Sequence, residues 1–307
     1  MSERPDKLML LDTASLYFRA FYGIPDTITA PDGTPVNAVR GLLDFITRLV
    51  DDHQPTRLVA AMDANWRPDF RVALLPSYKA HRVANPVINA EEVPDLLEAQ
   101  VPIIEDVLDA IGIAKFGVAG YEADDVIGTL SHASKIPVDI VTGDRDLFQL
   151  VDDDRGVRIL YTARGMSKLE VVDNARVVAK YGVPAASYAD FAALRGDPSD
   201  GLPGVAGVGE KTAAGLLGRW GTLESLLTAL DDPTQDVGAR PKLAAARDYL
   251  AVAPTVVRVA LDVPLPTYDD TLPASPADPE RLVELSARWG LDSPLNRLLS
   301  VLTRASA

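Results

Sequence analysis

The sequence has no cysteine among its 307 residues, and this absence removes several kinds of chemistry. It excludes disulfide bonds, zinc sites built on thiolates, and cysteine nucleophiles. No apolar run approaches the roughly 20 residues that a helix needs to cross a lipid bilayer. The first residues, Met1 to Lys7, do not place an apolar segment behind a basic one, so no signal peptide is indicated. We therefore expect a cytoplasmic protein without a membrane partner.

Basic residues are also in short supply. The chain has 30 Lys and Arg against 44 Asp and Glu, which gives a net charge of −14 and a pI near 4.6. An acidic average argues against nucleic-acid binding, because phosphates attract basic surfaces. The average misleads if many acids are gathered around metal ions while the bases lie elsewhere. We therefore expect concentrated metal-site acids and an acidic surface on the side away from any nucleic acid.

Short apolar runs at 7–11, 57–62 and 138–141 are each followed by aspartate. Helical patterns occupy 39–50, 94–111 and 123–133 between and around these runs. Apolar runs that alternate with helices predict an α/β fold with a parallel sheet. Ligands bind at the carboxyl ends of such strands, so Asp12, Asp63, Asp144 and Asp146 are expected to converge on one edge. Each aspartate alone is equally consistent with a helix N-cap.

The character of the sequence changes from about Asp190. Gly and Pro cluster at 196–209, and helical patterns follow at 211–220, 222–230 and 242–252. A connector rich in Pro and Asp spans 262–279, and a last amphipathic helix at 279–289 is expected to pack back on the body. We predict a core over residues 1–186 and a helical region over residues 187–307.

The densest acidic motif is formed by Glu122, Asp124 and Asp125 at the start of a helix. Acids in a first turn are favoured by the helix dipole, and ordinary capping is the simpler interpretation. Three carboxylates this close repel one another unless a cation is present. The absence of His and Cys from the motif disfavours zinc and favours a hard divalent ion.

Two more motifs add acids. Asp144 and Asp146 lie in Thr-Gly-Asp-Arg-Asp, and Asp197 and Asp200 lie in Gly-Asp-Pro-Ser-Asp, which is also good chemistry for a solvated turn. The candidate metal ligands are Asp12, Asp63, Glu122, Asp124, Asp125, Asp144, Asp146, Asp197 and Asp200. Nine carboxylates exceed the needs of one ion. Two ions about 4 Å apart can activate a water and stabilise the charge on a scissile phosphate.

The string that starts at Leu202 indicates which phosphoester is cut. Gly207 and Gly209 let a turn expose N–H groups at a helix N-terminus, and Lys211 and Thr212 add donors. A glycine hinge between two helices is the plainer alternative. The full string Leu-Pro-Gly-Val-x-Gly-Val-Gly-Glu-Lys-Thr-Ala resembles a helix-hairpin-helix element that grips a DNA phosphate without reading bases.

A basic patch with interleaved aromatic residues follows Asp63. Its members are Arg67, Phe70, Arg71, Tyr78, Lys79, His81 and Arg82. Such a patch suits a flexible single strand through stacking and phosphate contacts, although an amphipathic helix with a solvated basic face gives the same pattern. The stretch 77–92 has little apolar content and is predicted to be an arch or loop.

Together these strings resemble the 5′-nuclease family of flap endonucleases, phage 5′-exonucleases and the 5′-3′ exonuclease domain of bacterial DNA polymerase I. Tyr-Glu-Ala-Asp-Asp, Thr-Gly-Asp-Arg-Asp-Leu-Phe-Gln-Leu, Tyr-Lys-Ala-His-Arg and the Gly-Asp-Pro-Ser-Asp string occur in the family's order. The resemblance is to a stand-alone bacterial form. It implies a PIN-like, mostly parallel sheet flanked by helices, a helical arch over about 65–93, and a helix–three-turn–helix region.

The resemblance also implies roles. The first metal site would use Asp12, Asp63, Glu122 and Asp124, and the second Asp144, Asp146, Asp197 and Asp200, with Asp124 or Asp125 near both. Lys79 and Arg82 would steady the scissile phosphate, and with Asp124, Asp144 and Asp146 they are the expected catalytic residues. The expected DNA contacts are Arg19, Phe70, Arg71, Tyr78, Lys79, Arg82, Gly207, Gly209, Lys211 and Thr212. At least two Mg²⁺ or Mn²⁺ ions are expected, with a third left open, as is a potassium ion at the helix-hairpin-helix.

The implied function is structure-specific hydrolysis of DNA at 5′ ends and 5′ flaps, by a monomer acting in replication and repair. The family usually has Asn where this chain has Gly201, which puts the second metal site in question, and Asp12-Thr-Ala replaces the commoner Asp-Gly. A phosphatase of the haloacid-dehalogenase type is the first alternative, but it needs an Asp where Ala14 stands. The second is a non-catalytic DNA-binding homologue, which would have lost some of these carboxylates.

Overall fold

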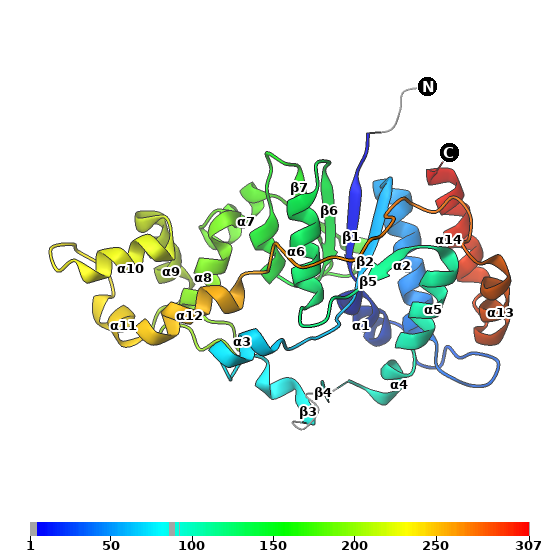
Figure 1. Ribbon diagram of the computed structural model, residues 1–307, viewed down its shortest axis with the longest axis horizontal. Helices are drawn as coiled ribbons and strands as arrows, with labels where there is room; N and C mark the ends of the chain where they lie inside the picture. The colour runs from blue at the N-terminus through cyan, green and yellow to red at the C-terminus, as the bar shows by residue number, and fades with distance from the viewer. Residues whose placement is uncertain (1–4, 86–89, 92, 307) are drawn as a thin grey trace.

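The computed structural model describes residues 5–85, 90–91 and 93–306. Its centre is a six-stranded sheet in the order β5-β2-β1-β6-β7-β8 (Figure 1). The strands are β1 (Leu8–Asp12), β2 (Arg57–Ala61), β5 (Ala114–Phe116), β6 (Val138–Thr142), β7 (Val157–Tyr161) and β8 (Glu170–Val172). Neighbours are parallel except β7 and β8. The predicted α/β fold with a mostly parallel sheet is confirmed.

Both faces of the sheet are covered, because its central strands are apolar on both sides. In β1, Leu8 and Leu10 belong to one core cluster and Met9 and Leu11 to another, as the two-residue period of a strand dictates. Helix α6 (Ala123–Ala133) packs on the first side. Helices α2 (Asn37–His53) and α5 (Val101–Ile111) cover the second.

The remaining helices lie around this core and beyond one end of it. They are α1 (Thr13–Gly23), α3 (Asp69–Leu74), α4 (Asp95–Glu98), α7 (Asn174–Tyr181), α8 (Tyr188–Arg195), α9 (Glu210–Trp220), α10 (Leu223–Asp231), α11 (Arg240–Ala245), α12 (Arg247–Val257), α13 (Pro279–Trp289) and α14 (Asp292–Ala305). Helices α8 to α12 form a lobe at one end of the molecule, which we call the helical lobe (Figure 1).

A connector returns from the helical lobe to the core along β2 (Figure 1). The Leu58 N–H donates to the Asp270 carbonyl at 2.8 Å, and the Leu272 N–H donates to the Thr56 carbonyl at 3.0 Å. The connector leads into α13, which lies against α5. Helix α14 follows and lies against α2. The helical lobe is therefore held between two stretches of chain that both pack on the core.

Two predicted helices are each divided in the structure. The pattern at 94–111 forms α4 and α5, and Pro102 stands in the first turn of α5, where its missing N–H costs nothing. The pattern at 242–252 forms α11 and α12. The predicted arch contains α3, a 3-10 turn at Ala80–Arg82 and an antiparallel pair, β3 (Val83–Asn85) with β4 (Ala90–Glu91). Residues 86–89 and 92 of the predicted arch lie outside the described residues.

Within the stretches that the structure describes, no helix combines the length and apolar character needed to span a bilayer.

Candidate active site

A cleft of about 1210 Å³ opens at the carboxyl ends of the parallel strands. In Figure 1 these ends point down, toward α1 and α3. The predicted metal ligands that line the cleft are Asp12, Asp63, Glu122, Asp124 and Asp144, and Glu98 lines it too. Lys79 and Arg82 line it as well, together with the aromatic residues Tyr17, Phe18, Tyr22, Phe45 and Trp66. The structure thus brings predicted metal ligands from four separate segments and the two predicted phosphate-binding cations into one cavity.

The acids at the strand ends serve as caps and face the cleft at the same time. Asp12 is the last residue of β1 and the N-cap of α1, where it accepts from the Ser15 N–H at 3.1 Å and from the Thr142 hydroxyl at 2.6 Å. Asp63 accepts from the N–H of Ala123, the first residue of α6, at 2.8 Å. A carboxylate offers about four acceptor positions, so the same side chain can cap a helix and still present acceptors to the cleft.

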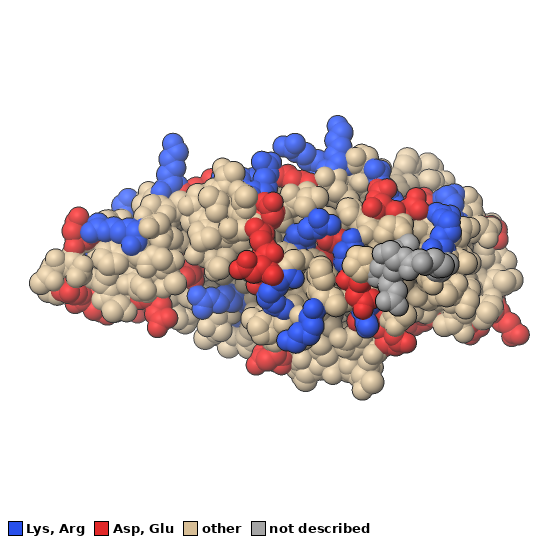
Figure 2. All heavy atoms as spheres, turned by 90° about the horizontal axis from the view of Figure 1, so that it is seen from above, with Lys and Arg blue, Asp and Glu red and all other residues tan. Residues whose placement is uncertain are grey.

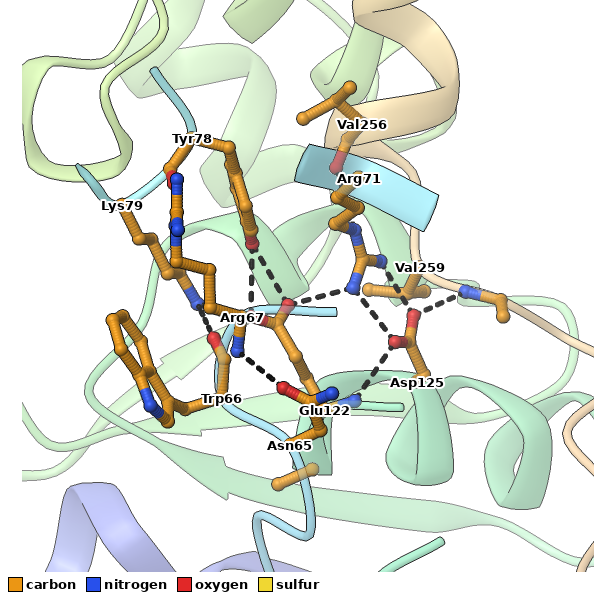
Figure 3. A network of polar contacts seen from close by, with 12 residues as sticks. Asn65, Trp66, Arg67, Arg71, Tyr78, Lys79, Glu122, Asp125, Val256 and Val259 are labelled. Carbon is orange, nitrogen blue, oxygen red and sulfur yellow. Dashed lines mark hydrogen bonds and ion pairs between the residues drawn. The ribbon is translucent and has the colours of Figure 1, made fainter. Parts of the chain in front are cut away.

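A buried network surrounds the Arg71 guanidinium (Figure 3). The guanidinium donates to Glu122 Oε2 at 2.8 Å and to the two Asp125 oxygens at 2.6 and 2.8 Å. It also donates to the carbonyls of Val256 at 2.9 Å and Arg258 at 3.1 Å. Arg71 therefore ties α3, the first turn of α6 and the end of α12 together.

Glu122 is also held from the side of the cleft. The Lys79 ammonium donates to its Oε1 at 2.6 Å, and the Tyr78 hydroxyl donates to its Oε2 at 2.9 Å (Figure 3). Glu122 and Asp125 additionally form a capping box at the start of α6. These bonds fix the first turn of α6, and Asp124 lies in that turn and lines the cleft.

The network corrects three predictions made from the sequence. Arg71 and Tyr78 were expected to contact DNA, but only 2% and 3% of their surfaces are exposed, so neither presents its side chain to a ligand. Asp125 was expected to bind metal, but it is fully buried and both oxygens are bonded to Arg71. A basic and aromatic pattern cannot distinguish a surface patch from a buried ion pair. Phe70, in contrast, is 38% exposed.

A second acidic group adjoins the cleft. Asp197 accepts from Arg195 at 2.9 Å and lies 3.6 Å from Arg145, and Asp200 accepts from Arg82 at 2.9 Å. Arg145 and Arg195 were missed from the sequence, although Arg145 stands inside the Thr-Gly-Asp-Arg-Asp motif. These cations neutralise acids that would otherwise repel one another.

Burial perturbs the carboxylates of the cleft. It is the main cause that raises the pKa of Asp12 to about 7, against an opposing bond from Thr142 and with support from the Asp63 charge. Burial, followed by the charges of Asp144 and neighbouring acids, raises the pKa of Asp124 and of Asp146 well above the ordinary value. The pKa of Asp144 is raised for the same reasons. A hard divalent cation would favour the ionised forms of all four.

The donor set fits Mg²⁺ or Mn²⁺, because it consists of carboxylate oxygens without His or Cys. As the side chains stand, however, no three or more acids or histidines of the described chain are arranged so that they could hold a metal ion. The reason is visible in the hydrogen bonds: Asp12, Asp63 and Glu122 are turned toward Thr142, Ala123 and Lys79. Ion binding therefore requires local turns of these side chains.

In metal-free buffer, Asp12→Asn is expected to raise the melting temperature by clearly more at pH 8 than at pH 5. Asp12 keeps its proton up to a pKa of about 7 in the folded state but loses it near 3.8 when unfolded. Between these values the folded state holds more protons, so the free energy of unfolding falls as pH rises. Thermal unfolding in EDTA measures this, with the exposed Asp154→Asn as control. An equal difference in melting temperature between Asp12→Asn and wild type at both pH values would contradict this prediction.

The glycine-rich turn lies at the start of α9. Gly207 has a φ of +73°, Gly209 is the N-cap of α9, and Lys211 and Thr212 are exposed in the first turn. The Lys242 ammonium donates to the Gly207 carbonyl at 2.8 Å. Sequence reasoning missed Lys242, which α11 brings to the turn from a distance along the chain.

Charge is distributed differently from the expected pattern on one face. Figure 2 shows the molecule from above in the orientation of Figure 1, which is the side of the amino ends of the strands, away from the cleft. Lys and Arg are interspersed there with Asp and Glu. The predicted acidic surface away from the substrate is therefore not found on this face.

Comparison with known proteins identifies relatives along the whole chain. Residues 7–182 match the model of a 5′-3′ exonuclease N-terminal resolvase-like domain, and residues 183–280 match that of a 5′-3′ exonuclease C-terminal SAM fold. A 5′-3′ exonuclease of Streptomyces coelicolor is 63% identical, covering 96% of this chain and 100% of the relative. DNA polymerase I of Mycobacterium tuberculosis is 42% identical over 91% of this chain and 30% of its own length.

Solved structures share the fold at low identity. A T5 D15 protein co-crystallised with metal ions has a TM-score of 0.64 at 17% identity, covering 98% of this chain and 100% of that one. Human GEN1 in complex with Holliday junction DNA also has a TM-score of 0.64, at 16% identity, covering 97% and 72%. The two matched family models span residues 7–280, and the Streptomyces coelicolor 5′-3′ exonuclease matches 96% of this chain over its own full length. The chain belongs to the 5′-3′ exonuclease family and is a nuclease.

Proposed function

We propose that this nuclease hydrolyses DNA at 5′ ends and 5′ flaps with two Mg²⁺ or Mn²⁺ ions bound in the acidic cleft. The observation that carries the proposal is the convergence of Asp12, Asp63, Asp124 and Asp144 on one cavity with Lys79 at its rim. When bound, the ions would supply an activated water and neutralise charge on the scissile phosphate. The raised pKa values of the acids are what a site built for cations would show in their absence.

The residues of the chain have separable tasks in this proposal. Asp12, Asp63, Glu122 and Asp124 would hold the first ion, and Asp144, Asp146, Asp197 and Asp200 would hold the second. Lys79 and Arg82 donate to the phosphate as negative charge develops on it. Without a metal ion, Glu122 also holds Lys79, whose pKa stays well above its usual value because the charges of Glu122 and its neighbours outweigh the effect of burial.

DNA would be gripped outside the cleft by the α9 turn through Gly207, Gly209, Lys211 and Thr212. Arg19 and Phe70 remain candidate contacts for the unpaired end, and the α9 turn is also where we place a potassium ion. We propose a core over 1–186, a helical region over 187–307, a monomer, a cytoplasmic location and a role in replication and repair.

A labelled 5′-flap substrate tests the proposal. The protein is incubated with the flap and with a matched blunt duplex, in Mn²⁺, in Mg²⁺ and in EDTA. Metal-dependent release of the flap with a 5′-phosphate on the cut end supports the proposal. Binding without cleavage in every buffer would favour the non-catalytic homologue, and release of inorganic phosphate alone would favour the phosphatase.

A further inference from the structure

The turn that carries Lys79 lies directly against the turn that carries Asp200. The Lys79 N–H donates to the Asp200 carbonyl at 2.9 Å, and the Ser77 hydroxyl donates to the Gly201 carbonyl at 2.8 Å. Arg82 donates to the Ser199 carbonyl at 2.7 Å and to Asp200 Oδ1 at 2.9 Å. Four hydrogen bonds therefore join residues 77–82, which we call the arch-base turn, to residues 197–201, which we call the acidic turn.

Gly201 makes this approach possible. A Cβ at this position would lie 2.1 Å from the Ser77 carbonyl oxygen and 3.0 Å from its carbon. Both are backbone atoms, so the collision cannot be relieved by rotating a side chain. Gly201 also has a φ of +71°, a conformation that residues with side chains rarely adopt. Any other residue would push the two turns apart.

The arch-base turn is itself held in an unusual conformation. Lys79 has a φ of +48°, which is uncommon for a residue with a side chain. Such a conformation persists where surrounding contacts impose it. Here the Lys79 N–H is bonded to the acidic turn while its ammonium reaches Glu122 at 2.6 Å. The direction of the Lys79 side chain thus depends on the contact between the two turns.

We propose that Gly201 is a positioning residue: by letting the two turns touch, it fixes Lys79 and Arg82 at the rim of the cleft before DNA binds. The proposal rests on the phosphate-binding roles given to Lys79 and Arg82 under the proposed function. The same contact explains why position 201 is glycine, since any larger side chain would meet the Ser77 carbonyl. The acidic turn thereby orders the cations as well as supplying carboxylates.

Gly201→Ala is the test, and Gly221→Ala is its matched control. Gly221 has a φ of +78° and open space where a Cβ would stand, so its substitution imposes the backbone strain without the collision. For Gly201→Ala we expect the turnover number on a 5′ flap to fall about a hundred-fold, as for a displaced catalytic group, with KM changed less than about three-fold. We expect neither change in Gly221→Ala.

Amide hydrogen exchange separates this proposal from the proposed function, because it needs no turnover. In Gly201→Ala, exchange at the Lys79 and Arg82 amides should accelerate at least ten-fold while amides of β1 and β6 keep wild-type rates. Wild-type exchange at Lys79 together with lost turnover would overturn the positioning role and leave the nuclease assignment standing. Wild-type turnover in Gly201→Ala would overturn it as well.

Ser77→Ala provides a second test, which remains available if the protein cannot fold with a Cβ at position 201. The Ser77 side chain is exposed, so its truncation leaves the core intact and removes one of the four hydrogen bonds between the turns. Exchange at the Lys79 amide should accelerate by a few-fold, in the same direction as in Gly201→Ala but less. Unchanged exchange in Ser77→Ala, with Gly201→Ala unfolded, would overturn the proposal.

Discussion

Asp144→Ala is expected to lower the turnover number on a 5′-flap substrate about a thousand-fold, because several kcal/mol of charge stabilisation would be lost at about 1.4 kcal/mol per factor of ten. Asp144 lines the cleft, and its pKa is raised by burial and by the charge of Asp200. Removing it takes away one of the carboxylates with which we propose that the chain holds the second ion. Quench-flow or gel assays with flap DNA in Mn²⁺ measure the change.

Asp144 also accepts a hydrogen bond that supports the local backbone. The effect of its charge must therefore be measured with a variant that keeps this acceptor. Asp144 Oδ1 accepts from the Asp146 N–H at 2.8 Å and so helps to begin the 3-10 turn at Asp146–Leu150. Asp144→Asn keeps an acceptor there and loses only the charge. The same large loss is expected in Asp144→Asn, while Asp154→Ala on an exposed turn retains full activity. Duplex binding should stay within a few-fold of wild type, and a variant that still turns over at one tenth of the wild-type rate would refute the assigned role.

Arg71→Met is expected to reduce the free energy of unfolding by about 3–5 kcal/mol, which is the usual effect of removing one partner from a buried ion pair. The substitution keeps much of the side-chain volume. It leaves Glu122 and Asp125 buried without their guanidinium, and it removes the link between α3 and the end of α12. Urea unfolding followed by circular dichroism gives the free energy.

The control for Arg71→Met is Arg48→Met. Arg48 pairs with Asp52 at 3.1 Å on an exposed helix face, where an ion pair contributes less than about 1 kcal/mol. Adding Asp125→Asn to Arg71→Met should restore part of the lost free energy of unfolding, because one uncompensated buried charge is removed. Equal destabilisation by Arg71→Met and Arg48→Met would show that the buried network does not stabilise the fold.

The sequence predicts the sheet edge well because its signals are local. The strands β1, β2 and β6 each end within two residues of an aspartate, and the rule that parallel strands share a carboxyl edge brings Asp12, Asp63 and Asp144 together. The Arg71 network could not be predicted in this way. Its partners Val256 and Arg258 lie far along the chain, and they meet α3 only because α12 packs against it. Burial of a charged side chain depends on such tertiary contacts, which spacing does not encode.

The close contact at Gly201 could not be predicted from the sequence either. A missing asparagine reads as the loss of a hydrogen bond beside a metal ion. In the structure the same position is a close contact with the Ser77 carbonyl, and only the geometry reveals the need for a hydrogen atom in place of a side chain.

The helical lobe is inserted between two stretches of chain that pack on the sheet, and it carries both the α9 turn and the loop with Asp197 and Asp200. A helical lobe transplanted from a relative would therefore bring two of the proposed ligands of the second metal ion together with the proposed DNA-binding turn. A change in the position of the helical lobe would therefore be expected to alter the proposed DNA contact and the proposed metal site together.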